Sequence, residues 1–304
     1  MIRPSIKNET SRLRKVVLGV ADNFGGVPAL SDAYDPKSKE HIINGTFPSQ
    51  ENVSIQMNML EKALLKYDVQ VLRPLNVKGV NQIFARDIGI VIDDTFIVPN
   101  IIIERRKEVE ALGSIMEKIS ANNILRAPEN VRMEGGDVMP WNELLFVGYS
   151  KQLDFDTYKV SRTNEAGVEF LKSNFPNRKV VALELKKSDD NAKENALHLD
   201  CIFQPIGIDK AIVYKGGFKY ESDYKFIEEY FGVDNLIHIS KEEMYHMNSN
   251  IFSIDQNIII SNTSFTRLNS ILRSMGFIVE EVSYDEVSKM EGLFRCSTLP
   301  LVRD

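Results

Sequence analysis

Pairs of short apolar runs, each pair divided by polar residues, recur along the chain and predict β-hairpins. The clearest pair is GIVIDDTFIVP at 89–99, in which Asp93 and Asp94 separate two runs rich in isoleucine and valine. The chain is therefore expected to repeat one hairpin-based unit. The other copies lie at 138–150, 201–214 and 251–261.

Each hairpin is followed by apolar residues at helical spacing and then by β-branched residues typical of a strand. One unit thus contains a hairpin, a helix and a strand. The predicted helices lie at about 103–119, 163–174, 222–231 and 265–275. The strands that follow them lie at 123–128, 179–185, 236–240 and 277–283.

A fifth unit is divided between the two ends of the chain. Residues 13–20 and 69–75 predict strands, residues 51–66 predict an amphipathic helix, and GLFRCSTLPLV at 292–302 supplies the remaining hairpin arm. A last strand that docks beside the first would close five units into a ring with no open edge. The pattern therefore predicts one α/β domain of five repeated units.

Residues 21–50 interrupt this pattern with a long polar stretch that carries Phe24, Tyr34 and Phe47. Loops of this length in compact domains are usually lids or binding loops, or they are disordered. The sequence leaves these readings open.

Composition limits the class of protein. With 304 residues, 43% of them hydrophobic and 26% charged, the chain can form one large or two modest domains with a substantial core. It has no apolar run of about 18 residues that could span a bilayer, and its N-terminal residues lack the apolar stretch of a secretory signal. We expect a soluble, cytoplasmic protein without a membrane partner.

Charge and ligand spacing exclude further classes. The net charge of -6, without a Lys/Arg-rich block or a Gly-rich phosphate loop, argues against nucleic acid as a partner. Cys201 and Cys296 are far apart and form neither a disulfide framework nor a C-x-x-C site, and the four histidines lack H-E-x-x-H spacing. We expect no metal, and a homodimer stays open.

Polar residues precede each hairpin at a corresponding place in the unit. If the five units form a ring, side chains at matching ends converge on its axis, where they could form one site. These residues are Asn81, Phe84, Arg86 and Asp87 in the first unit, Glu134 and Asp137 in the second, His198 and Asp200 in the third, Asn248 and Asn250 in the fourth, and Cys296 in the fifth.

This set has the chemistry needed for a guanidino substrate. Carboxylates such as Asp87 and Asp200 accept the five donors of a planar guanidinium. The Cys296 thiolate is the strongest nucleophile available, and a bound guanidinium, Arg295 or protonated His198 could lower its pKa. His198 is suited to proton transfer near neutral pH.

These roles combine into one hypothesis. Cys296 attacks the guanidinium carbon, His198 protonates the departing amine, and a covalent amidino-cysteine remains. His198 then activates the water or amine that releases the product. Glu134 orients His198 or the ligand.

Each candidate also has a purely structural reading. Cys296 could be a small apolar filler in a buried terminal strand, and Glu134 a turn carboxylate. His198 could be a hydrogen-bonded core histidine, and Asp87 could form a salt bridge with Arg86. Cys201, Gly135 and Gly136 favour packing and turn geometry over chemistry.

Four motifs together resemble the guanidine-modifying enzymes of the pentein fold, which include arginine deiminases, dimethylarginine hydrolases and amidinotransferases. They are NQIFARD at 81–87, MEGGD at 133–137, HLD at 198–200 and RCSTLPLVRD at 295–304. The resemblance implies a single-domain, five-bladed α/β-propeller over residues 1–304 and no metal or organic cofactor. It also implies Cys296 as nucleophile, Glu134 and His198 as its catalytic partners, and Asp87 and Asp200 as guanidinium ligands, with Asn81, Phe84 and Asn250 beside the substrate.

The sequence indicates less clearly which reaction the protein catalyses. SRTNEAGVEFL at 161–171 is similar to segments of both amidinotransferases and deiminases, which implies that Arg162 meets a substrate carboxylate. Glu291 stands at a position where an arginine would help to bind the substrate carboxylate. An acidic side chain there would disfavour a carboxylate and favour an amine in the substrate, unless it points to solvent. A deiminase-like hydrolase of arginine or a derivative ranks first. An amidinotransferase and a non-catalytic binding protein are the alternatives.

Overall fold

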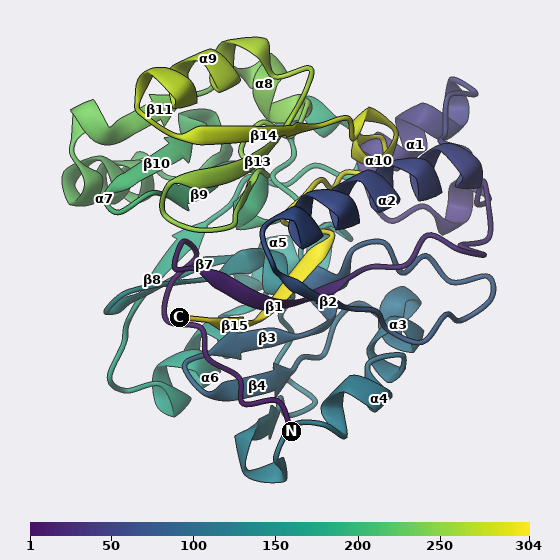
Figure 1. Cartoon of the computed structure of the whole chain (residues 1–304), viewed down its shortest axis with the longest axis horizontal. Coiled ribbons are helices and arrows are strands. Elements are labelled where there is room, and N and C mark those ends of the chain that lie inside the picture. Colours follow the sequence, from purple (N-terminus) through teal and green to yellow (C-terminus); the bar gives the residue numbers. More distant parts are fainter.

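A computed structural model describes all 304 residues, and its strands form five separate three-stranded sheets (Figure 1). In each sheet the middle strand is antiparallel to one neighbour and parallel to the other. This geometry arises when a hairpin is joined through a crossover connection to a parallel third strand. The five predicted units are therefore observed.

The sheets consist of the following strands, given for each sheet in their order across it: β15 (Thr298–Arg303), β1 (Leu13–Leu18) and β2 (Gln70–Leu72); β3 (Ile90–Ile92), β4 (Thr95–Val98) and β5 (Ile124–Arg126); β6 (Val138–Trp141), β7 (Leu144–Tyr149) and β8 (Lys179–Glu184); β9 (Phe203–Ile206), β10 (Lys210–Val213) and β11 (Leu236–His238); β12 (Phe252–Ser253), β13 (Ile258–Asn262) and β14 (Ile278–Val282).

The two ends of the chain share one sheet, as predicted. Strand β15 pairs antiparallel with β1, so that Leu18 lies opposite Thr298 and Leu13 opposite Arg303. Strand pairing does not continue from one sheet to the next. The expectation of a ring without open edges is therefore wrong at the level of the strands, because every sheet keeps two edge strands of its own.

Ten helices accompany the sheets. The predicted helix at 103–119 is broken into α3 and α4, and Gly113, a poor helix former, stands at the start of the second piece. The helices are α1 (Pro36–Ile43), α2 (Gln50–Lys66), α3 (Arg106–Glu110), α4 (Gly113–Met116), α5 (Gln152–Thr157), α6 (Glu165–Asn174), α7 (Glu221–Phe231), α8 (Lys241–Tyr245), α9 (Thr266–Ser274) and α10 (Asp285–Ser288).

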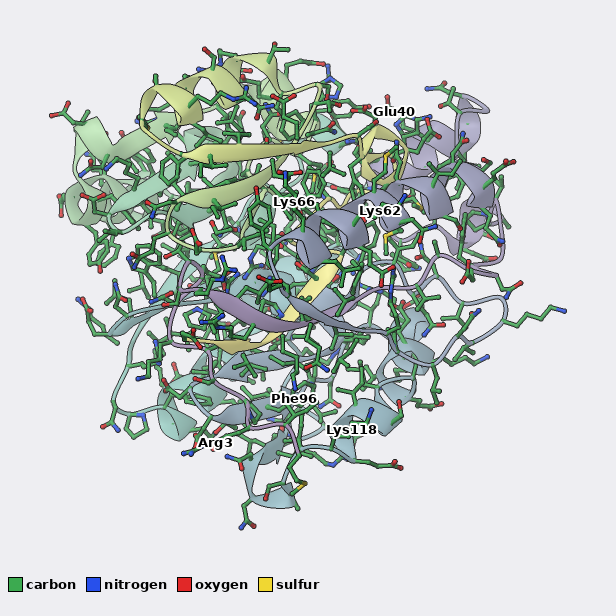
Figure 2. The ribbon with its side chains drawn as sticks, in the orientation of Figure 1. Arg3, Glu40, Lys62, Lys66, Phe96 and Lys118 are labelled. Carbon is green, nitrogen blue, oxygen red and sulfur yellow. The ribbon has the colours of Figure 1, made fainter.

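Helix α2 joins the N-terminal part of the chain to the last complete unit. Its buried residues include Val53, Met57, Leu60 and Leu64, which follow helical spacing and pack into the main core. On its outer face Lys66, labelled with Lys62 in Figure 2, forms an ion pair of 2.6 Å with Glu280 of β14. No helix is both long and apolar enough to cross a membrane.

Residues 21–50, which we call the lid segment, carry structure of their own. Asp35 caps helix α1 by accepting a hydrogen bond of 2.6 Å from the backbone N–H of Ser38. Lys37 donates from Nζ to the carbonyl of Tyr245 at 2.6 Å, and Tyr245 donates to Glu40, labelled in Figure 2, at 3.0 Å. The lid segment is therefore fastened to the body of the molecule near α8.

Candidate active site

Three short 3₁₀ turns contain Asp87 and Asp200 and directly follow Phe84, Glu134 and His198, and each turn leads into a hairpin. They span Ala85–Ile88, Gly135–Asp137 and Leu199–Cys201, and they precede β3, β6 and β9. The middle turn packs against both others. Equivalent positions of three units thus meet in space, which is the convergence that their shared register predicts.

The glycines of these turns permit the close approach. A Cβ atom on Gly135 would lie 2.0 Å from the carbonyl oxygen of Arg86, and one on Gly136 would lie 2.7 Å from Cγ of His198. A Cβ on Gly292 would likewise meet the ring of Phe84 at 2.3 Å. The Gly135–Gly136 pair, interpreted above as turn geometry, is required mainly because backbone and imidazole pack where a side chain would stand.

His198 is held between two carboxylates. Its Nε2 atom lies 2.9 Å from Oε2 of Glu134, and its Nδ1 atom lies 3.8 Å from Oδ1 of Asp87. Nδ1 is buried and has no hydrogen-bond partner. Burial lowers the pKa of His198, but Asp87 and Glu134 outweigh burial, so that the net pKa is raised. Glu134 orients the imidazole and leaves one ring nitrogen free.

The sulfur of Cys296 lies between an amide and a carboxylate. Asn250 donates from Nδ2 to Sγ at 3.1 Å, and Asn250 Oδ1 accepts from the Cys296 backbone N–H at 3.1 Å. Oδ2 of Asp200 lies 3.6 Å from Sγ. Burial, followed by the charges of Asp200 and Asp87, raises the pKa of Cys296 well above its ordinary value. The thiol is therefore protonated near neutral pH in this state.

Arg295, one of the three cations that could lower the thiol pKa, is engaged by carboxylates instead. Its guanidinium binds Oδ2 of Asp200 at 2.9 Å and Glu9 at 3.1 and 3.2 Å, and it also donates to the carbonyl of Val138 at 3.0 Å. Arg86 lies 4.0 Å from Glu9. We call Glu9, Arg86, Asp200 and Arg295 the Asp200 cluster. Burial raises the pKa of Glu9, but Arg295 and Arg86 outweigh it and hold that pKa at about 2.

Asp87 already pairs with an arginine that the sequence analysis did not identify. Arg105 donates from Nη1 to Oδ2 of Asp87 at 2.6 Å and binds both oxygens of Glu108 at 2.8 Å. The same Nη1 atom lies 3.6 Å from Oε2 of Glu134. We call Asp87, Arg105 and Glu108 the Asp87 cluster. Burial raises the pKa of Glu108 to about 7, against the opposing effect of Arg105.

Arg162 links the reactive residues to the lid segment. It is almost fully buried, and it donates to Oε2 of Glu134 at 3.1 Å and to the carbonyl of Tyr34 at 2.9 Å. Its guanidinium also lies 5.5 Å from the centre of the Tyr34 ring. Burial raises the pKa of Glu134, but Arg162 and the hydrogen bond to His198 make the net shift a lowering. Glu134 is therefore a carboxylate.

Glu291 is buried and faces the lid segment, not solvent. It accepts from Asn195 Nδ2 at 2.8 Å and from the backbone N–H of Lys37 at 3.4 Å. Burial and the neighbouring Asp35 raise its pKa well above the ordinary range. Burial lowers the pKa of Lys37 to about 8, although Glu291 opposes this shift. The acidic residue singled out in the sequence is thus part of the contact that holds α1 in place.

A cavity of about 560 Å³ lies beneath the lid segment. Tyr34, Asp35 and Phe47 of the lid segment form part of its wall, and Asn81 and Glu108 lie on the side of the body. Asn81 also lies 3.8 Å from the sulfur of Met290 through Nδ2. The cavity is large enough for a small organic molecule, and it reaches the Asp87 cluster through Glu108.

The three residues Asp87, Glu134 and His198 each offer one ligand atom within 4.8 Å of the others. A metal ion could in principle use this set. Arg105 and Arg162 already contribute positive charge to the two carboxylates, so a further cation here would be repelled. Both carboxylates are therefore already compensated by cations of the protein, which disfavours a metal ion at this position.

The sequence shows some of these residues and hides others. The motifs locate Cys296, His198, Glu134, Asp87, Asp200 and Asn250, which the fold brings together. Arg105 and Glu108 occur in ERRKEVE, at 104–110, which looks like an exposed charged helix and gives no signal of burial. Glu9 lies 286 positions from its partner Arg295.

Known proteins resemble this chain in sequence and in structure. Residues 43–303 match the model of the family described as "N,N dimethylarginine dimethylhydrolase, eukaryotic". The uncharacterized protein YkgA of Bacillus subtilis (strain 168) is 28% identical over 252 residues, which are 82% of this chain and 79% of that protein. The family match confirms the resemblance to guanidine-modifying enzymes.

Solved structures share the fold at low sequence identity. An amidinotransferase of saxitoxin biosynthesis from Microseira wollei superimposes with a TM-score of 0.77 at 16% identity, covering 99% of this chain and 97% of that one. The N-terminal domain of ArgZ, an arginine dihydrolase from cyanobacteria, gives 0.78 at 20% identity over 95% and 98%. Inosamine-phosphate amidinotransferase from Streptomyces griseus gives 0.76 at 16% identity over 100% and 97%.

Proposed function

The chain belongs to the N,N-dimethylarginine dimethylhydrolase family, and on that premise we propose that it is a cysteine-dependent hydrolase of arginine or an arginine derivative. The product would be a ureido compound, with ammonia or an amine released. We also propose that the five sheets are the blades of a pentein propeller, with the reactive residues near its axis. The observation that carries the proposal is the convergence of Cys296, the His198–Glu134 pair and two carboxylates in one buried site.

In the first step the Cys296 sulfur forms a bond to the guanidinium carbon, and the bond from that carbon to the leaving nitrogen breaks. His198, whose free Nδ1 faces Asp87, gives its proton to the leaving amine. The thiol of Cys296 must first lose its own proton, and Oδ2 of Asp200, 3.6 Å from Sγ, is a neighbouring acceptor for it. The positive charge of a bound guanidinium beside Asp200 and Asp87 would offset the two carboxylates that raise the thiol pKa.

In the second step His198 removes a proton from water, and the water oxygen bonds to the carbon as the carbon–sulfur bond breaks. The thiol is regenerated and the ureido product leaves. Glu134 keeps the imidazole oriented and stabilises its protonated form. Arg162 is the candidate for a carboxylate at the far end of the substrate, because it carries the charge and lies beside the cavity-lining Tyr34.

A product analysis by mass spectrometry tests the reaction. The purified protein is incubated in H₂¹⁸O with L-arginine, agmatine or N-methylated arginines, each with and without glycine or lysine. A hydrolase gives an ¹⁸O-labelled ureido product whether or not an amine is added. A new guanidino compound that forms only with an added amine would instead make the protein an amidinotransferase.

Two variants connect the reaction to the site. Cys296→Ala should form no product from any of these substrates, and acid-quenched wild-type protein should carry the mass of an amidino adduct on the peptide that contains Cys296. Asp87→Asn should raise KM strongly or abolish activity. Absence of turnover and of adduct with every substrate would favour a non-catalytic binding protein.

A further inference from the structure

Asp137 has no part in the reaction scheme, yet its side chain contacts the backbone next to His198. The carboxylate is fully buried. Its Oδ1 atom accepts a hydrogen bond of 2.9 Å from the backbone N–H of Leu199, the residue after His198. Its Oδ2 atom accepts a hydrogen bond of 2.6 Å from the hydroxyl of Thr163. Each oxygen of this carboxylate therefore has a donor of its own.

Thr163 extends the contact to Glu134. Its Oγ1 atom, which donates to Asp137, also accepts from the backbone N–H of Glu134 at 3.3 Å. The backbone carbonyl of Glu134 accepts from the N–H of Asp137 at 3.1 Å. Arg162, which precedes Thr163, donates to the Glu134 side chain at 3.1 Å. The backbone and the side chain of Glu134 are thus both held by Asp137 and by the Arg162–Thr163 segment.

The surroundings of Asp137 leave its carboxylate little room to move. A Cβ atom on Gly148 would lie 2.6 Å from Oδ1 of Asp137, so the carboxylate packs directly against strand β7. Its partners are a hydroxyl and a backbone N–H, not a paired cation. A carboxylate buried in this way is costly unless it is hydrogen-bonded. Its presence here therefore indicates a need for two strong, fixed acceptors.

On the basis of the proposed function, we propose that Asp137, through Thr163 and Leu199, is the positioning residue that fixes His198 against Glu134. Nε2 of His198 and Oε2 of Glu134 lie 2.9 Å apart, although the two residues precede turns of different units. Asp137 connects both turns to one carboxylate. The placement matters because proton transfer by His198 is sensitive to displacements of about 1 Å.

Removal of one hydroxyl tests this role. Thr163→Val keeps the branched shape but can neither donate to Asp137 nor accept from Glu134. In the full-length protein its kcat should fall at least about tenfold while KM changes less than about twofold, because proton transfer and not substrate binding is disturbed. Thr163→Ser keeps the hydroxyl and should recover most of the lost kcat.

Thr10→Val is the matched control. Thr10 is equally buried, and its hydroxyl donates to the carbonyl of Gly207 at 2.7 Å, a contact that involves neither Glu134 nor His198. An equal loss of kcat in Thr10→Val, or a kcat of Thr163→Val within about twofold of wild type, overturns the inference. Should Thr163→Val fail to fold, Asp137→Asn takes its place and should show the same loss, because an amide has only one acceptor oxygen.

A measurement without substrate separates this inference from the proposed function. NMR titration of isotope-labelled histidine follows His198, whose signal is identified by its absence in His198→Gln. The hydrogen bond to Glu134 supports the protonated imidazole, so His198 should titrate at lower pH in Thr163→Val than in wild type and in Thr10→Val.

An unchanged titration of His198 in Thr163→Val overturns the positioning role and leaves the proposed function in place. Absence of turnover by the wild-type protein with every guanidino substrate overturns the proposed function instead. In that case the titration alone decides whether Asp137 and Thr163 position His198 against Glu134.

Discussion

The Asp200 cluster and the Asp87 cluster both pair a carboxylate with a buried arginine, yet they differ in what surrounds the pair. In the Asp200 cluster, Arg295 and Arg86 hold the pKa of Glu9 at about 2 against the effect of burial. In the Asp87 cluster, burial prevails over Arg105 and raises the pKa of Glu108 to about 7. Glu9 in the first cluster stays ionised near neutral pH, whereas the second cluster contains a carboxylate that can take up a proton near neutral pH.

This difference matches the position of each cluster. The Asp200 cluster contains Glu9 from the N-terminal segment and Arg295 from the segment before β15, so it connects the two ends of the chain inside the protein. The Asp87 cluster borders the cavity through Glu108. A charged network with many fixed partners favours rigidity, whereas a residue beside a cavity can change partners at lower cost. Cys296 contacts the first cluster through Asp200, and the cavity adjoins the second through Glu108.

The largest effect is expected when the thiol of Cys296, whose pKa is raised by residues of both clusters, is removed. Cys296→Ala should lower kcat by at least about a thousandfold, because the covalent step has no substitute nucleophile. Thermal unfolding should stay close to wild type, and Cys201→Ala is the matched control because Cys201 is also buried and lies 3.7 Å from Asp200. Turnover by Cys296→Ala near the wild-type rate would remove Cys296 from the reaction.

Replacement of Arg295 in one cluster and of Arg105 in the other should lower the free energy of unfolding by different amounts. Arg295→Met should cost about 3–5 kcal/mol of unfolding free energy, because Glu9 and Asp200 lose their buried counter-charge. Arg105→Met should cost less, because Glu108 can be neutralised by a proton. Urea unfolding at pH 7 measures both.

The exposed pair of Arg14 and Asp304 provides a control. Arg14→Ala should change the unfolding free energy by less than about 1 kcal/mol, as expected for surface ion pairs. Equal losses for Arg105→Met and Arg295→Met would contradict the distinction between the clusters.

Acid should weaken the Asp200 cluster through Glu9. The pKa of Glu9 is lowered from 4.5 to about 2 in the folded protein, so its contribution to stability is present above about pH 4.5 and is lost as the pH falls towards 2. The contribution corresponds to about 3 kcal/mol. Glu9→Gln should therefore be less stable than wild type at pH 6. The difference in unfolding free energy between the two proteins, measured by urea titration, should be smaller at pH 3.

The thiol of Cys296 should report the charge of Asp200. The burial that raises its pKa remains in Asp200→Asn, but the largest charge contribution is removed, so the pKa should fall. Iodoacetamide labelling from pH 6 to 10 in a Cys201→Ala background gives the profile, with Asp93→Asn as a surface control. A profile that does not move would place the cause of the raised pKa in burial alone.

The smallest effect is expected at Glu291, under the lid segment. Its folded-state pKa is raised, so the stability associated with its protonation is full below about pH 4.5 and is lost as the pH rises towards the folded value. Glu291→Gln imitates the protonated form, so its free energy of unfolding should fall less than that of wild type as the pH rises from 5 to 8. The expected difference in melting temperature between variant and wild type is a few degrees. A larger loss of stability in the variant than in wild type over this pH range would contradict the prediction.

The sequence by itself determined the repeating unit. Apolar runs interrupted by pairs such as Asp93–Asp94 and Asn142–Glu143 fix hairpins locally, and both Asp93 and Asn142 adopt the positive φ that such turns use. The register of Asp87, Glu134 and His198 at the start of successive hairpins follows from the same local pattern. Because repeated units have repeated geometry, this register was enough to indicate that these residues meet.

Only the tertiary structure decided which charges are compensated. Glu9 finds Arg295, and Arg105 turns inward onto Asp87, through contacts that no local pattern encodes. For the same reason the sequence left Arg295 open as one of three cations that could lower the pKa of the thiol, and it did not show that the lid segment contains a helix docked on Glu291. Turns and apolar spacing reflect interactions between near neighbours in the chain. Burial depends on everything that packs around a residue, and the pKa of Cys296 depends on burial.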